Sequence, residues 1–287
     1  MNSREAVFAG SWYPRKAADC AREIERFLQQ GIPKPQSQAH PAQWIGGIVP
    51  HAGWYYSGQI ACNVMNWLRE ETPPEVVVLF GMHLHAASAN HMMPAGAWQT
   101  PFGTLPVAED LADHLIQRFD FQVETSSRFV QDNTIELQLP FVKYLLDPKT
   151  ILGIGTAPNA TALQIGETVA DWARENGRRI KIIGSTDLTH YGPNYGFMPK
   201  GTGPQALDWV RQENDRRAVE AFLAMAPQSI MDEGRRNQNT CCSGAIAAAV
   251  AAIRQMGATI AKEVAYATSY DKSPGESFVG YAGVVFG

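Results

Sequence analysis

The chain has 287 residues, of which 45% are hydrophobic and 18% are charged, and its net charge is −4 at neutral pH. This length and apolar content are sufficient for a large core in one α/β domain spanning residues 1–287. The slightly acidic balance and the lack of a basic run argue against nucleic-acid binding.

The sequence also argues against secretion and membrane insertion. Its N-terminus lacks the apolar stretch of a secretory signal. The longest apolar run, AIAAAVAAI at 245–253, is shorter than the ~20 residues that a membrane helix needs. The four cysteines form no C-x-x-C pair, so neither a disulfide framework nor a zinc ribbon is indicated. We expect a cytoplasmic protein that makes no contact with a membrane.

Apolar β-branched runs alternate with amphipathic segments along the chain. Strands are predicted at 44–50, 75–80, 150–155, 180–185, 262–270 and 277–286. Helices are predicted at 16–30, 58–70, 107–118, 134–146, 160–175, 205–223 and 241–256. This alternation predicts an α/β fold with a central, mostly parallel or mixed sheet that helices cover on both faces. The last two strands are expected to be antiparallel.

Histidines follow three of the predicted strands. His51 follows the strand at 44–50, His83 and His85 follow the strand at 75–80, and Asp187 and His190 follow the strand at 180–185. Ligands of open α/β sheets bind at the carboxyl ends of the strands, so these side chains are expected to face one cleft. Such a group suits either metal binding or general acid–base chemistry. The alternative for each histidine alone is a hydrogen-bonded turn residue.

The segment NTCCSG at 239–244 adds thiols at the predicted start of a helix. A helix N-terminus lowers the pKa of a thiol, which favours a nucleophile or a metal ligand. A free cysteine is also often a small buried hydrophobic residue. Neighbouring side chains on a helix point in different directions, so at most one of Cys241 and Cys242 is expected to face a given cleft.

Two further segments carry candidate pocket residues. In DNTIELQLPF, at 132–141, Glu136 either supports the start of a helix or reaches the site as an acid, a base or a partner of a ligand, and the structural role is favoured. In AGSWYP, at 9–14, Trp12 and Tyr13 either wall a pocket or hold the N-terminus in place. Phosphate-binding loops, dinucleotide fingerprints, nucleophile elbows and H-E-x-x-H motifs are absent from the sequence.

Six motifs together resemble one known family. AGSWYP, PHAGWYYSG, FGMHLH, TIELQLPF, STDLTHYG and NTCCSG occur in the order and spacing of the Memo family, whose bacterial and archaeal members are called AmmeMemoRadiSam system protein B. The similarity covers nearly the whole chain. The family resembles the class III extradiol dioxygenases, which bind non-haem iron on an α/β fold, so the resemblance implies an extradiol-dioxygenase-like fold.

The resemblance also implies a metal site of two histidines and one cysteine, which match His51, His85 and Cys242. His85 is favoured over His83 because the family carries its ligand at the second position of that loop. Asp187 and His190 match further site residues that lie near the metal or act as acid and base. The expected substrate pocket comprises Trp12, Tyr13, Trp54, His83, Asn133 and Glu136.

The sequence departs from the family at one site position. Asn133 stands where the family has a histidine before the helix, which removes a proton-transfer group or a substrate contact. The histidine loop also reads GMHLH instead of the more typical G-P-N-H or G-P-S-H-H.

These observations favour a metal-dependent redox or dioxygenase-like enzyme acting on a small molecule. Iron or copper suits one thiolate and two imidazoles, zinc is an alternative, and magnesium and calcium are disfavoured. Two other functions remain open, namely a non-catalytic protein that binds a ligand or peptide on the same fold and a zinc-assisted hydrolase. The family's name and usual gene neighbours imply a radical-SAM partner protein, and a homo-oligomer is also open.

Overall fold

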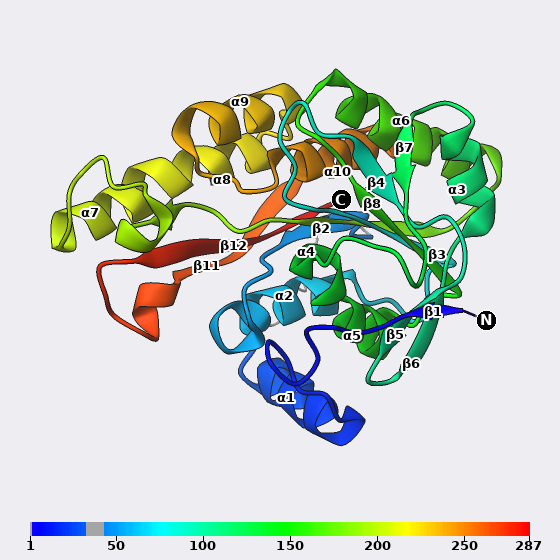
Figure 1. Cartoon of the computed structure of the whole chain (residues 1–287), viewed down its shortest axis with the longest axis horizontal. Helices are drawn as coiled ribbons and strands as arrows, with labels where there is room; N and C mark the ends of the chain where they lie inside the picture. The colour runs from blue at the N-terminus through cyan, green and yellow to red at the C-terminus, as the bar shows by residue number, and fades with distance from the viewer. Residues whose placement is uncertain (1, 33–42) are drawn as a thin grey trace.

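A computed structural model describes residues 2–32 and 43–287, and within them a nine-stranded mixed sheet forms the centre of the molecule (Figure 1). From edge to edge the strands are β10 (His190–Tyr191), β12 (Phe278–Phe286), β2 (Gly46–Val49), β9 (Ile180–Ser185), β3 (Val76–Gly81), β8 (Thr150–Gly155), β4 (Asn90–Met92) and β7 (Phe121–Val123), with β11 (Ala261–Thr268) paired to β12. The predicted α/β class with a mixed sheet is confirmed.

The four central strands, β2, β9, β3 and β8, are mutually parallel. Nearly all of their residues are buried, as expected for apolar strands that helices cover on both faces. β12 pairs antiparallel with both β2 and β11, so the predicted antiparallel pair at the end of the chain is confirmed. Because the central strands are parallel, their carboxyl ends lie along one edge of the sheet, and the loops that leave this edge lie close together.

Helices cover both faces of the sheet (Figure 1). One layer contains α3 (Glu109–Ile116), α6 (Ala160–Glu175), α8 (Asp215–Leu223), α9 (Pro227–Asn237) and α10 (Ser243–Gln255), and the other contains α1 (Ala17–Gln29), α2 (Trp54–Leu68), α4 (Asn133–Glu136) and α5 (Leu139–Phe141). α7 (Pro204–Trp209) lies at one end of the molecule, and β1 (Ser3–Arg4), β5 (Ala97–Thr100) and β6 (Gly103–Pro106) form a small second sheet.

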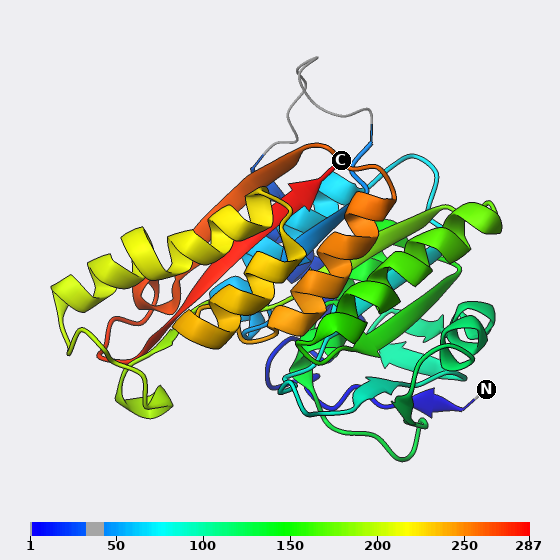
Figure 2. The same ribbon diagram turned by 90° about the horizontal axis from the view of Figure 1, so that it is seen from above.

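α10 is the most deeply buried helix of its layer, and it lies alongside α6 (Figure 2). The two helices approach closely because α6 carries Gly166 where it meets the backbone of Ala248. Each helix begins near the carboxyl edge of the sheet, and the first turn of α10 contacts the segment before α6, since a Cβ added at Gly244 would lie 2.5 Å from Pro158 N. The position of the cysteine turn that precedes α10 is therefore fixed by helix packing.

Two helical regions differ from the prediction. α9 has no counterpart among the predicted helices, because its sequence contains few apolar residues. Its buried residues are Pro227, Ile230 and Met231. The helix expected at 134–146 is divided into α4, α5 and a π-helical turn, with Pro140 at the start of α5.

Among the described residues no helix is long and apolar enough to cross a membrane.

Candidate metal centre

The carboxyl edge of the sheet brings together side chains from three loops. His51 leaves β2, Asp187 leaves β9 and His83 leaves β3, and these strands are adjacent in the order β2, β9, β3. The turn before α10 completes the group, because the N–H of Cys241 donates to the carbonyl of Asp187 at 3.2 Å. The prediction that side chains after these strands converge at one site is met for His51, His83 and Asp187.

Four side chains form one compact cluster of nitrogen and sulfur donors, namely His51, His83, Cys241 and Cys242. Their potential ligand atoms all lie within 4.8 Å of one another. The Nε2 atom of His51 is 3.4 Å from the Sγ atom of Cys241, and the two imidazole rings lie edge to face with centroids 4.9 Å apart. We refer to these four residues as the His/Cys cluster.

Hydrogen bonds fix the orientation of the His51 ring. Its Nδ1 atom is 3.0 Å from the hydroxyl of Ser185, and that hydroxyl donates its only proton to the carbonyl of Thr134 at 2.7 Å. The hydroxyl must therefore accept from Nδ1–H, which directs Nε2 toward Cys241. The backbone also holds this residue, because the His51 N–H donates to Asp187 Oδ1 at 2.7 Å.

A carboxylate orients the second imidazole in the same way. The Nδ1–H of His83 donates to Asp132 Oδ2 over 3.1 Å. Although burial disfavours the ionised form, hydrogen bonds from His83 and Thr134 lower the pKa of Asp132 to about 2. Burial likewise opposes the charged form of His83, but bonds to Asp132 and Cys241 raise the pKa of this histidine to about 10. The carboxylate–histidine pair is typical of the outer partners of metal ligands.

The two cysteines have opposite protonation preferences. Burial opposes ionisation of both, but contacts with Cys242, His51 and His83 bring the pKa of Cys241 well below its usual value. Burial and the neighbouring sulfur raise the pKa of Cys242. These surroundings favour the thiolate form at Cys241 over Cys242, and the Cys241 sulfur also accepts a hydrogen bond from the Asp187 N–H at 3.3 Å.

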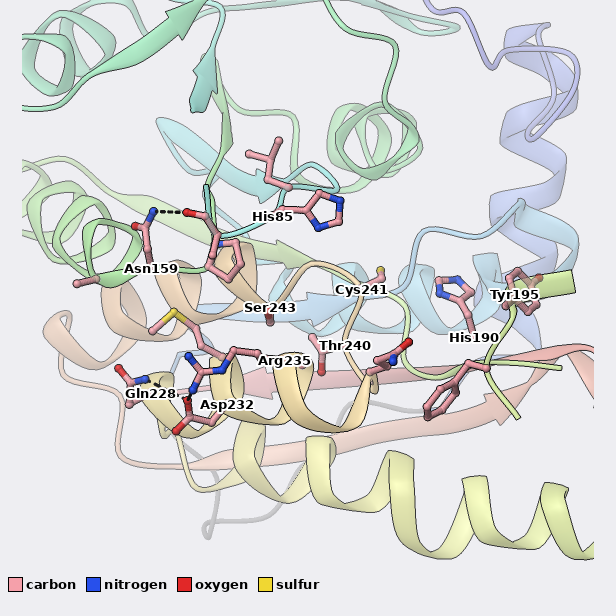
Figure 3. A pocket seen from close by; sticks show the side chains of 18 residues that line it. His85, Asn159, His190, Tyr195, Gln228, Asp232, Arg235, Thr240, Cys241 and Ser243 are labelled. Atoms are coloured by element: carbon pink, nitrogen blue, oxygen red, sulfur yellow. Dashed lines mark hydrogen bonds and ion pairs between the residues drawn. The ribbon is translucent and has the colours of Figure 1, made fainter. Parts of the chain in front are cut away.

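Two cavities border the cluster from different sides. The first, of about 580 Å³, is walled largely by aromatic rings and serine hydroxyls and reaches His51 and His83; we call it the aromatic cavity. The second, of about 960 Å³, lies beside α9 and the starts of α6 and α10 and reaches Cys241; we call it the large cavity (Figure 3). His190 and Tyr195 line both cavities, and their rings lie 5.0 Å apart.

Two of the three ligands implied by the sequence resemblance lie in the His/Cys cluster, and the third does not. His51 lies in the cluster, and Cys242 is also a member, although it is buried and its pKa is raised. His85 lies outside the cluster and lines the large cavity, with its backbone N–H bonded to Ser88 (Figure 3). The residues that the cluster contains in addition to the predicted ligands are His83 and Cys241.

The predicted pocket residues divide into two groups. Trp12, His83 and Asn133 line the aromatic cavity, and the amide of Asn133 donates to the carbonyl of His51 at 2.8 Å. The residues that line neither cavity are Tyr13, Trp54 and Glu136.

The residues outside the cavities have structural roles. Glu136 accepts hydrogen bonds from the N–H groups of Val7 and Phe8 and from the Tyr13 hydroxyl, which ties the N-terminal segment to α4. Trp54 stacks on Phe141 with ring centroids 4.1 Å apart and is buried in the core. For Glu136 the favoured structural role therefore agrees with its contacts. Tyr13 and Trp54 lie in the core, because their rings pack against each other with centroids 5.6 Å apart.

A second buried carboxylate supports the loop that carries Asp187 and His190. Asp215 is fully buried and accepts hydrogen bonds from the backbone and hydroxyl of Thr189 and from the hydroxyl of Tyr266. Sequence analysis did not identify this residue, because its partners come from distant parts of the chain. Burial raises the pKa of Asp215 to about 6, against the lowering effect of these hydrogen bonds.

This shift predicts a pH-dependent contribution to stability. The native state binds a proton at Asp215 more tightly than the unfolded state, so the contribution is fully present below the unfolded pKa of 3.8 and is lost as the pH rises through about 6. Relative to Asp215→Asn, the free energy of unfolding of the wild type should fall by about 2 kcal/mol between pH values of about 4 and 7. Urea unfolding of both proteins across this range measures the difference, and parallel curves would contradict the assignment.

Comparisons with known proteins agree with this architecture. A family model described as Memo-like protein matches residues 4–285. Among the relatives are a MEMO1 family protein of Methanopyrus kandleri, 31% identical over 292 residues with 99% of this chain and 98% of the relative covered, and one of Methanosarcina acetivorans, 31% identical with 99% of each covered. A MEMO1 family protein of Pyrococcus furiosus is 28% identical, with 98% of each chain covered.

A solved structure supports the fold. The crystal structure of an uncharacterized protein of Escherichia coli K12 has a TM-score of 0.55 and 12% identity, and the match covers 85% of this chain and all of that one. At this identity the likeness concerns the fold alone. The family match over nearly the whole chain confirms the resemblance recognised in the sequence motifs. The chain belongs to the Memo-like protein family.

Proposed function

We propose that this protein is a metal-dependent enzyme in which His51, His83 and Cys241 hold one transition-metal ion beside the aromatic cavity. The observation that carries the proposal is the orientation of both imidazoles. Ser185 and Asp132 each accept a hydrogen bond from Nδ1, so both rings turn the other nitrogen toward the same thiolate. In this proposal His83 is a ligand in place of His85, and Cys241 is a ligand in place of Cys242, which the sequence resemblance had implied.

The donor set fits a transition metal. One thiolate and two imidazoles suit iron, copper or zinc, whereas magnesium and calcium prefer oxygen ligands. Three protein ligands leave coordination positions open, as catalytic metal centres require. Metal binding requires a deprotonated thiol and neutral imidazoles, so a bound cation would displace the protons that these side chains carry.

The proposed activity is redox or dioxygenase-like chemistry on a small molecule. Iron or copper would supply a redox-active centre at the open end of the cluster. The aromatic cavity has room for a small substrate, and its walls combine the Trp12, Tyr55 and Tyr56 rings with serine hydroxyls. Aromatic walls with a few polar groups hold and orient a ligand while they exclude water.

His190 is the proposed proton-transfer residue. Its side chain lines the aromatic cavity and rests against the ring of Tyr195. Asn133 cannot take this role, because an amide does not titrate and its N–H group is bonded to the His51 carbonyl. Asp187 is buried close to His51 and His190, and although burial raises the pKa of its carboxyl, both imidazoles favour the ionised form, which would stabilise a protonated His190.

Elemental analysis tests the proposal. Protein purified anaerobically, without a metal-affinity tag, is expected to contain close to one iron or copper ion per chain, and His51→Ala and Cys241→Ala are expected to contain none. Such a result would lead to screens of oxygen uptake with small-molecule libraries. Zinc in place of iron or copper would favour metal-assisted hydrolysis. Absence of metal even after anaerobic reconstitution would contradict the proposal and favour a non-catalytic ligand-binding protein.

A further inference from the structure

Two adjacent thiols lie at the border of the cluster and the large cavity. The Sγ atoms of Cys241 and Cys242 are 3.7 Å apart. Cys241 lines the large cavity (Figure 3), whereas Cys242 does not line it and has an exposed fraction of 2%. A reagent that enters the large cavity therefore contacts Cys241 first. The Cys242 sulfur is close enough to react with the modified Cys241 sulfur.

The surroundings of Cys241 favour reaction at its sulfur. The sulfur accepts a hydrogen bond from the Asp187 N–H and lies 3.4 Å from His51 Nε2. Hydrogen-bond donors and imidazoles around a sulfur are the environment in which cysteines react with oxidants. The other two cysteines, Cys20 and Cys62, are fully buried and provide internal controls.

We propose that Cys241 and Cys242 form an oxidation site at which a hydroperoxide converts the pair into a reversible vicinal disulfide. The Cys241 sulfur attacks the terminal peroxide oxygen, the O–O bond breaks, and the products are a sulfenic acid and an alcohol, or water when the oxidant is hydrogen peroxide. The Cys242 thiol then attacks the sulfenic sulfur, forming the S–S bond and releasing water. Two thiols and one hydroperoxide thus give one disulfide, one alcohol and one water.

Chain geometry makes this disulfide easy to reduce. Adjacent Cα atoms lie about 3.8 Å apart across a trans peptide, which is below the 4.4–6.8 Å that unstrained disulfides span. Strained disulfides have more oxidising potentials, which is the property of switchable bonds and not of structural ones. Because the disulfide forms from the sulfenic acid and can be reduced again, Cys242 protects Cys241 from irreversible oxidation to the sulfinic acid.

Formation of the disulfide would also remove a ligand from the His/Cys cluster. This consequence rests on the proposed function, because it requires Cys241 to be the metal-bound sulfur. The oxidation itself requires only the two thiols and the large cavity. The two claims therefore have separate readouts.

Mass spectrometry of the full chain tests the oxidation. The chain is treated with chelator, exposed to hydrogen peroxide, alkylated and digested with trypsin, which releases both cysteines in one peptide, residues 237–254. We expect this peptide to lose two hydrogens and both alkylation sites, and to regain them after dithiothreitol. Cys20 and Cys62 should be alkylated after denaturation in all samples.

The matched variant Cys242→Ser lacks the resolving thiol. Its peptide is expected to gain two or three oxygens on Cys241, and dithiothreitol should not reverse the change. A wild-type peptide that gains oxygens in the same way, or that remains fully reduced, would overturn the inference. If the disulfide forms but the oxidised chain still binds one equivalent of metal, the oxidation site stands and the assignment of Cys241 as a metal ligand fails.

Discussion

Replacement of His83 by alanine is expected to weaken metal binding by more than the 10–100-fold that loss of an outer partner of a ligand typically costs. His83 contributes a donor atom to the cluster, and Asp132 holds its ring in place. His85, two residues along the same loop, lies outside the cluster, so His85→Ala should leave the affinity unchanged within about twofold. Competition with a chelator of known affinity measures both constants.

The pair of variants is well matched, because both side chains still reach solvent, that of His83 being 43% exposed, and neither substitution opens the core. Thermal unfolding should therefore be similar for both variants, which separates loss of a ligand from loss of the fold. The opposite ranking, with His85→Ala weakening the affinity and His83→Ala leaving it intact, would restore the ligand assignment implied by the sequence resemblance.

Gly166→Ala is expected to destabilise the fold severely, by more than about 3 kcal/mol, which is an exceptional cost for one methyl group. A Cβ at this position would lie 2.9 Å from the carbonyl carbon of Ala248 and 3.2 Å from its Cα, and these are backbone atoms of a buried helix that cannot rotate away. The propensity scale predicts the opposite sign, because alanine in place of glycine within a helix gains roughly 0.5–1 kcal/mol where space allows. Urea unfolding gives the sign directly.

Glu167→Ala provides the control on the same helix. This residue is exposed, and its replacement should change the free energy of unfolding by no more than about 0.5 kcal/mol. If Gly166→Ala were as stable as the wild type, α6 and α10 would not be packed as closely as the structure has them. The turn with Cys241 immediately precedes α10, so a shift of this helix should also weaken metal binding.

The parts of the fold that are periodic and apolar were predictable from the sequence. The strands at 150–155 and 180–185 and the helix at 160–175 have the predicted bounds, since each is set by a continuous apolar run or a clear helical period. The short strands β4 to β7 were not predicted. Three- and four-residue strands with mixed burial carry too few residues to establish a period.

The location of the candidate site was also predictable, because it follows from the carboxyl ends of parallel strands. It was not predictable that His83, and not His85, belongs to the His/Cys cluster. The loop after β3 turns at Met82, which has a φ of 73°, and this left-handed residue decides that His83 faces the cluster. The spacing of residues in a sequence does not reveal such a turn.

The residues that hydrogen-bond to the two imidazoles of the cluster could not be predicted from the sequence either. Ser185 and Asp132 are far from their histidines in sequence, and neither belongs to a motif that would indicate a hydrogen bond to an imidazole. One signal was available for Asp132, because Asp-x-x-x-Glu before an apolar run is close to the pattern of a helix start, and Asp132 does cap α4. A radical-SAM partner, a homo-oligomer and a cytoplasmic location stay predictions.

The most direct test of the account is X-ray absorption spectroscopy of the chain loaded with one equivalent of zinc. The proposed ligands predict one sulfur neighbour at about 2.3 Å and imidazole nitrogens at about 2.0–2.1 Å. The sulfur signal should vanish in Cys241→Ser and persist in Cys242→Ser. A zinc ion surrounded only by oxygen and nitrogen in the wild type, or a sulfur signal that survives in Cys241→Ser, would contradict the assignment of Cys241 as the thiolate ligand.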